Sequence, residues 1–252
     1  MSKEKKRVAI IADTKMHMGP WVARELAQKN HDLVIADPAE GLAEELRGLG
    51  AKVEVVEGAE DLNDQNSVKK MVDRAMDVFG HFDAACIRSG HHGVSDIFHI
   101  TQEDMDGQVA GNMMSVVYAL QVLLPPLVEQ KSGQIVINTS AGGDKPVPAC
   151  ASYCATRAGA NMLIRCAAYT VAEHGVCVNA TGTNYMNYPS YLHDMGADKD
   201  PSVIERIAAT IPLRRLGEPK EAAHFVASLL DGENSYQTGN FFPIDGGNAN
   251  SC

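Results

Sequence analysis

The chain has 252 residues, of which 45% are hydrophobic, and its net charge is −10 with a pI near 5.3. This length can bury one full core, and the acidic balance argues against nucleic acid or an anionic membrane surface as a partner. The basic residues 3–7 belong to what we interpret as a solvated, flexible leader over residues 1–6. We recognise no signal peptide and no apolar stretch approaching about 18 residues, so we predict a cytoplasmic protein.

The six cysteines show no spacing typical of metal ligands, and several lie in apolar segments, as reduced intracellular cysteines do. No metal site is predicted.

Short apolar segments alternate with helical patterns along the chain. The expected strands are residues 7–12, 31–36, 52–56, 83–87, 134–138, 176–180 and 240–244. The clearest helical patterns cover residues 20–30, 67–79, 105–130, 153–174 and 219–230. This alternation predicts an α/β fold over residues 1–252: one domain with a doubly wound, parallel, seven-stranded sheet of the Rossmann type.

The turn after the first expected strand reads Asp-Thr-Lys-Met-His-Met-Gly over residues 13–19. A dinucleotide-binding turn carries a glycine fingerprint here, and only Gly19 stands at its expected place. Met16 and His17 put side chains where the backbone would approach pyrophosphate. Asp13 would repel a phosphate by roughly 4 kcal/mol for unit charges about 4 Å apart at an effective dielectric of 20. The turn therefore predicts no nicotinamide cofactor.

A long stretch without a clear pattern, residues 181–201, follows the sixth expected strand. The carboxyl edge of an open α/β sheet normally builds the substrate site, so we expect a loop that covers it.

Ser140 is followed thirteen residues later by Tyr153, and Arg157 lies four residues beyond that on the same helical face. In a short-chain dehydrogenase the third position is lysine, which binds the nicotinamide ribose and passes protons onward. Arginine still favours a phenolate electrostatically, but it cannot give up its proton, and its planar fork does not replace an ammonium on a ribose.

The chain resembles the short-chain dehydrogenase/reductase superfamily along its whole length. The resemblance rests on Asn112, Ser140, the Tyr153 segment and the closing Pro-Ile-Asp-Gly-Gly of residues 243–247. Within this superfamily it is most similar to the halohydrin dehalogenases, and among these to the subtype that acts on bulky and cyclic epoxides. Arg157, the loss of the glycine turn, and Gly-Thr-Asn-Tyr at residues 182–185 carry this finer resemblance.

The resemblance implies a reversible reaction without a redox cofactor. Tyr153, with Arg157 favouring its phenolate form, would remove the proton of a vicinal halohydrin, and the alkoxide would displace halide to form an epoxide. Ser140 would hydrogen-bond the substrate oxygen. In reverse, halide, azide, cyanide or nitrite would open the epoxide.

The resemblance also implies a halide or nucleophile pocket, in the space that a nicotinamide would fill. Its predicted walls are His17, Thr183, Asn184, Tyr185 and Met186, with backbone amides near Asn184 and Tyr185 as donors. The family has a threonine and an aromatic residue where this chain has Ala12 and His17. His17 therefore either lines the pocket or only fills space.

Such proteins are usually tetramers that pair the helices beginning near Met105 and Tyr153, so we predict a homotetramer. The small residues within 153–160 permit a close approach of helices.

Two other functions stay open. One is an NAD(P)-dependent alcohol dehydrogenase or ketoreductase that tolerates arginine at 157, in which Asp37 would bind the ribose and Arg88 a phosphate. The other is an inactive scaffold or regulatory protein, which would leave the spacing of Ser140 and Tyr153 without a use. Halide release and nicotinamide binding would separate these functions.

Overall fold

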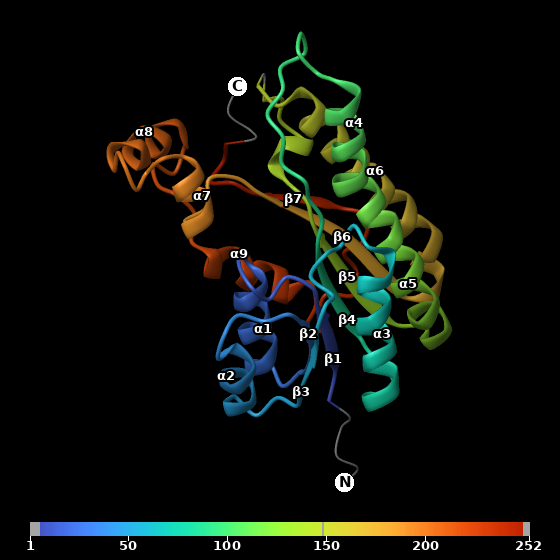
Figure 1. Ribbon diagram of the computed structural model, residues 1–252. Helices are drawn as coiled ribbons and strands as arrows, with labels where there is room; N and C mark the ends of the chain where they lie inside the picture. Colours follow the sequence, from blue (N-terminus) through green and yellow to red (C-terminus); the bar gives the residue numbers. More distant parts are fainter. Residues whose placement is uncertain (1–5, 148, 249–252) are drawn as a thin grey trace.

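The computed structural model describes residues 6–147 and 149–248. Its centre is a parallel sheet of seven strands in the order β3-β2-β1-β4-β5-β6-β7, which confirms the predicted fold class (Figure 1). The strands are β1 (Val8–Ile11), β2 (Asp32–Ala36), β3 (Val53–Val56), β4 (Ala84–Arg88), β5 (Gly133–Asn138), β6 (Val176–Thr183) and β7 (Phe241–Ile244). All were predicted to within a few residues, because strands covered on both faces are short and almost wholly apolar.

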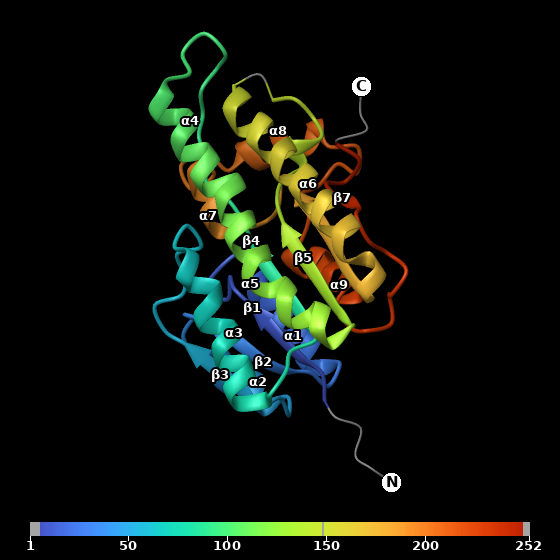
Figure 2. The same cartoon turned by 90° about the vertical axis from the view of Figure 1, so that its right-hand side faces the viewer.

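Helices cover both faces of the sheet and bury two separate apolar layers. One face carries α1 (Gly19–Gln28), α2 (Leu42–Gly48) and α9 (Pro219–Ser228). The other carries α3 (Gln65–Phe79), α5 (Ser115–Gln130) and α6 (Ala151–Val171), as Figures 1 and 2 show. Each strand alternates its side chains between the two layers. Because the strands are parallel, all of them end at one carboxyl edge of the sheet, where the site is expected.

A continuous helical run precedes β5. It consists of α4 (Gln102–Val109), a π-helical turn η1 (Ala110–Met114) and α5. By length and composition this run, Gln102–Gln130, could cross a membrane, contrary to the expectation that no apolar stretch approaches that length. Val116, Ala119, Leu123 and Leu127 are buried in the layer under α3 and α6, as in the core helix of a globular domain.

The stretch 181–201 is more regular than expected. Its first residues extend β6 to Thr183, and a short helix α7 (Pro189–Asp194) follows, with α8 (Ser202–Thr210) after it. Pro189 stands at the start of α7, where its missing N–H leaves no intrahelical bond unmade. Together α7 and α8 form an arm beyond the carboxyl edge of the sheet (Figure 1).

The expected leader falls mostly outside the described residues, because residues 1–5 are not among them. Lys6 is described, and its ammonium donates to the Gly50 carbonyl at 2.8 Å.

Candidate functional site

Ser140 stands directly beyond β5 in an extended conformation. Its Oγ accepts a hydrogen bond from the Gly142 amide at 3.1 Å and so caps the short 3-10 turn η2 (Ala141–Gly143). Gly182 on β6 packs against it so closely that a Cβ there would lie 2.5 Å from the Ser140 carbonyl carbon. Since Oγ is used as an acceptor, the hydroxyl proton can be donated to a substrate oxygen.

Tyr153 and Arg157 lie one turn apart on α6 and touch each other. The guanidinium carbon of Arg157 is 4.9 Å from the centre of the Tyr153 ring. Burial lowers the pKa of Arg157, whereas the charge and the hydrogen bond of Tyr153 oppose this shift. Arginine keeps its proton in proteins, so a buried cation lies against the Tyr153 ring.

Arg157 is anchored on the segment after β4. Its Nη1 donates to the carbonyl oxygen of Ser89 at 2.8 Å and to the Ser89 hydroxyl at 3.1 Å. A Cβ at Gly90 would lie 2.2 Å from Nη2, so the guanidinium fills the space beside this glycine. Nη1 is therefore held by the chain itself, whereas Nε is buried without a hydrogen-bond partner among the described residues.

The turn after β1 is closed by its own side chains. His17 has a left-handed backbone, with φ of 56°, and its Nδ1 lies 3.4 Å from a carboxylate oxygen of Asp13. The same oxygen of Asp13 is 3.7 Å from Nε of Arg88. A Cβ at Gly19 would fall 1.3 Å from the Asp13 carbonyl oxygen, so this glycine serves the turn itself. No glycine here provides open backbone for a pyrophosphate.

Tyr188 is a residue of this site that the sequence analysis missed. Its ring meets His17 edge-to-face with centroids 5.3 Å apart, and Thr183 hydrogen-bonds its hydroxyl. Burial raises the pKa of Tyr188 to about 12, so it is a proton donor at neutral pH. The sequence held no signal for it, because Tyr188 lies outside any motif and reaches the site only through the path of the chain before α7.

The five residues predicted to bind halide are divided between two places. His17 and Thr183 come together through Tyr188. Asn184, Tyr185 and Met186 instead line a cavity of about 130 Å³ beside Ile211 and Leu213. Met186 also packs into the layer under α1 and α9, and Tyr185 packs against α8. Tyr185 has a left-handed backbone, with φ of 48°, so the chain leaves the extended conformation of β6 at this point. That the five residues bind halide stays a prediction. The role of the backbone amides near Asn184 stays a prediction.

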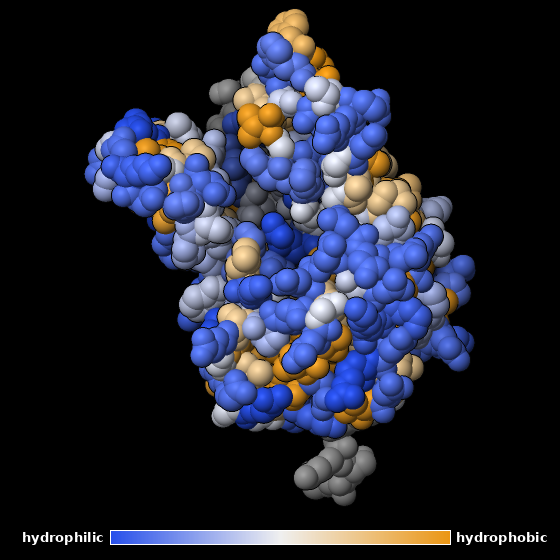
Figure 3. Space-filling view, viewed as in Figure 1, coloured by the Kyte–Doolittle hydropathy of each residue, from blue (hydrophilic) through white to orange (hydrophobic). Residues whose placement is uncertain are grey.

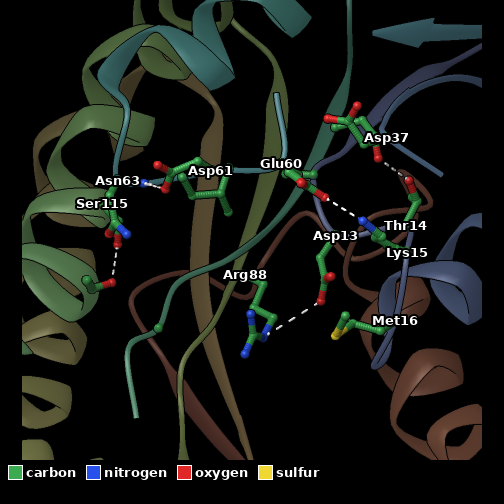
Figure 4. A pocket seen from close by; sticks show the side chains of 15 residues that line it. Asp13, Thr14, Lys15, Met16, Asp37, Glu60, Asp61, Asn63, Arg88 and Ser115 are labelled. Atoms are coloured by element: carbon green, nitrogen blue, oxygen red, sulfur yellow. Dashed lines mark hydrogen bonds and ion pairs between the residues drawn. The ribbon is translucent and has the colours of Figure 1, made fainter. Parts of the chain in front are cut away.

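A second cavity of about 210 Å³ is lined by Asp13 and Arg88 and lies between the ends of β1, β2 and β4. Figure 4 shows its lining, including the ion pair of Lys15 with Glu60 at 3.0 Å and that of Arg88 with Asp13. The four carboxylates in this lining belong to Asp13, Asp37, Glu60 and Asp61. They outnumber the two cations and disfavour a phosphate.

Asp37 directly follows β2, where an NAD-binding enzyme would hold the ribose. Each of its carboxylate oxygens already accepts a backbone amide at 2.8 Å, one from Gly58 and one from Ala59. Asp37, Asp13 of the β1 turn and Arg157 therefore each have partners within the chain.

Asn112 lies in the π-helical turn and is fully buried. It accepts from the His91 amide at 2.9 Å and donates to Oγ1 of Thr156 at 2.9 Å. It thus ties the segment after β4 to the helix that carries Tyr153.

Within residues 6–147 and 149–248, no group of three or more His, Cys, Asp or Glu side chains is placed to hold a metal ion.

Residues 14–249 match the family model described as enoyl-(acyl carrier protein) reductase. The chain is 31% identical over 254 residues to oxidoreductase UcpA of Salmonella typhimurium, covering 98% of this chain and 96% of that protein. It is 26% identical over 244 residues to the 3-oxoacyl-[acyl-carrier-protein] reductase FabG of Staphylococcus epidermidis, covering 95% and 97% of the two chains.

Solved structures agree with the fold. Levodione reductase superposes with a TM-score of 0.87 at 26% identity, covering 99% of this chain and 100% of that one. YwfH, described as an NADPH-dependent reductase involved in bacilysin biosynthesis, superposes with a TM-score of 0.90 at 22% identity, covering 98% and 100%. All four of these proteins are named as reductases or oxidoreductases, and none as a dehalogenase.

Proposed function

The chain belongs to the short-chain dehydrogenase/reductase superfamily, and from this premise we propose that it is a halohydrin dehalogenase. It would interconvert vicinal halohydrins and epoxides without a redox cofactor, and would open epoxides with small anions such as azide, cyanide and nitrite. The observation that carries the proposal is the turn after β1, where Asp13 and His17 stand in place of glycine backbone and a carboxylate oxygen of Asp13 lies 3.4 Å from His17 and 3.7 Å from Arg88 of β4.

The forward reaction uses the three residues next to the substrate. Tyr153 takes the proton of the substrate hydroxyl, and the resulting alkoxide attacks the neighbouring carbon and expels halide. Ser140 donates its free hydroxyl proton to the same substrate oxygen, since its Oγ lone pair is engaged by Gly142. Arg157 is buried beside the Tyr153 ring and supplies the positive charge nearest to the proton-transfer group.

The departing halide needs donors but no fixed positive charge that would retain it. Tyr188 offers a phenol that stays protonated, and it lies between His17 and Thr183. Amides near Asn184 would add neutral donors. Arg88 is paired with Asp13, which reduces its pull on an anion.

The second candidate is an NAD(P)-dependent alcohol dehydrogenase or ketoreductase. The names of the relatives favour it over a dehalogenase, and so does the cavity of about 210 Å³ that Asp13 and Arg88 line. Against it stand the engaged carboxylate of Asp37 and the anchoring of Arg157 on Ser89.

Two assays on the purified protein decide between these candidates. We expect release of chloride from 1,3-dichloro-2-propanol without added nicotinamide, and binding of NAD and NADP no tighter than millimolar by calorimetry. Micromolar binding of either nucleotide together with absent halide release would replace the dehalogenase with the oxidoreductase.

The assembly also remains a proposal. A homotetramer is expected from the resemblance alone, because the small residues of α6 have a role within the chain: a Cβ at Gly159 would lie 3.0 Å from the terminal methyl carbon of Met113. The proposed partners are a small halohydrin or epoxide and a halide or similar anion, with no nucleic acid and no membrane.

A further inference from the structure

We propose that His92 is a positioning residue for Tyr153: its neutral imidazole holds the tyrosine ring in the orientation in which the phenol transfers a proton. The inference rests on the proposed function only in taking Tyr153 as the proton-transfer group. Neither the sequence motif nor the resemblance pointed to this histidine.

The Tyr153 ring is enclosed from several directions. The His92 ring meets it edge-to-face, with centroids 5.2 Å apart and planes at 64°. Arg157 lies with its guanidinium carbon 4.9 Å from the centre of the same ring. On a third side is Gly142, where a Cβ would come within 3.1 Å of Cε1. Of these neighbours, His92 is the only one contributed by the segment after β4.

The backbone that carries His92 is fixed, although the side chain is exposed. The amide of His91 donates to the buried side chain of Asn112 at 2.9 Å. A Cβ at Gly93 would lie 2.1 Å from Nε2 of Gln108, which is buried. On the other side Gly90 is pressed against Arg157. A mobile loop could not orient a ring, whereas this segment is held at residues 90, 91 and 93.

The charges around His92 favour its neutral form. Partial desolvation lowers its pKa, and the positive charges of Arg157 and His91 lower it further, whereas Asp194 at the end of α7 opposes them. The imidazole therefore stays neutral to a lower pH than a free histidine does. Protonation would add a cation beside Arg157, and the repulsion between the two charges would weaken the contact of His92 with Tyr153. The contact should be lost only when the pH falls below this lowered pKa.

Two substitutions separate ring packing from imidazole chemistry. His92→Ala should lower kcat for halide release by about 10- to 100-fold with KM changed less than twofold, because a small misplacement of a reacting group has effects of this order. His92→Phe keeps an aromatic edge and should stay within about threefold of wild type. The matched control, His99→Ala, removes an exposed histidine of the same segment that pairs with Asp96 at 2.8 Å, and should leave kcat unchanged.

The pH profile gives a second readout. Opening of an epoxide by bromide needs a protonated phenol, which acid pH favours. A fall in the rate of epoxide opening at acid pH therefore reports the titration of a group other than Tyr153. We expect wild type to lose rate at acid pH and His92→Phe to keep it. A kcat for His92→Phe as low as that for His92→Ala, or an unchanged acid limb in His92→Phe, would overturn the proposal.

A measurement without turnover distinguishes this proposal from the dehalogenase assignment. In protein labelled with 3-fluorotyrosine, Tyr153→Phe assigns the Tyr153 resonance. That resonance should shift in His92→Ala and stay in place in His99→Ala. An unmoved resonance overturns the positioning role whatever reaction is catalysed. A shifted resonance in a protein that releases no halide supports the contact and overturns only the dehalogenase.

Discussion

The two ends of the site, the turn of residues 13–19 and the segment from Ser140 to Arg157, differ in what they retain. The second keeps serine and tyrosine at a working spacing, held by β5 and α6. The first keeps only Gly19 and fills the remaining space with Asp13 and His17. The difference teaches that the first turn can depart from the glycine pattern while serine and tyrosine keep their spacing, because separate elements position the two ends.

The segment after β4 links the two ends. Arg88 reaches Asp13 in the first turn, and Ser89 anchors Arg157 on α6. Next along the chain, His92 reaches Tyr153. This segment therefore contacts both ends of the site through its own residues.

The largest effect is expected from Tyr153→Phe. Removing the proton-transfer group should lower halide release and epoxide opening by about 10² to 10⁴-fold, the usual contribution of general acid/base help. Halide release at saturating substrate measures this, with circular dichroism as the control for folding. A variant with more than about a tenth of wild-type activity would require another base.

Ser140→Ala should come next, at about 10² to 10³-fold, the usual effect of removing one oriented donor. The fold should be little changed, because the substitution removes only the cap on Gly142. The rates kcat and kcat/KM should fall together if the bond forms mainly in the transition state. A rise in KM alone would show that Ser140 only binds substrate.

Arg157→Lys tests whether the acid/base end can recover a cofactor function. Lysine cannot reproduce the fork that donates to Ser89, so we expect halide release to fall by about 10-fold and the free energy of unfolding by about 1–3 kcal/mol. We expect no NADH-linked turnover, because the first turn stays closed. Such turnover, followed at 340 nm, would contradict the separation of the two ends.

The smallest effect is expected from Asp37→Ala. Halide release should change less than twofold, while loss of the acceptor for two amides should reduce the free energy of unfolding by about 1 kcal/mol. Chemical denaturation and the halide assay measure the two quantities. In an NAD-dependent enzyme the same change would weaken cofactor binding and turnover, so a large loss of activity would favour the second candidate.

The strands, the long helices and the order of motifs could be predicted from the sequence, because apolar period and spacing are local properties of the chain. The short helix α7 was not predicted, since six residues are too few to show a period. In the structure Met186 packs into the layer under α1 and α9, and Tyr185 packs against α8. That these two residues bind halide stays a prediction. Tyr188 and His92 escaped prediction because each acts through a neighbour distant in sequence.

The sequence alone determined which chemical groups are present: a serine, tyrosine and arginine at fixed spacing, and a first turn that keeps only Gly19 of the glycine pattern. Only the tertiary structure decided what those groups contact. In the folded chain Arg157 donates a hydrogen bond to the Ser89 carbonyl, and Asp37 accepts hydrogen bonds from the Gly58 and Ala59 amides. The physical reason is that residue type and spacing fix charge, size and helical face, whereas hydrogen-bond partners come from segments that meet only when the sheet and its helices pack.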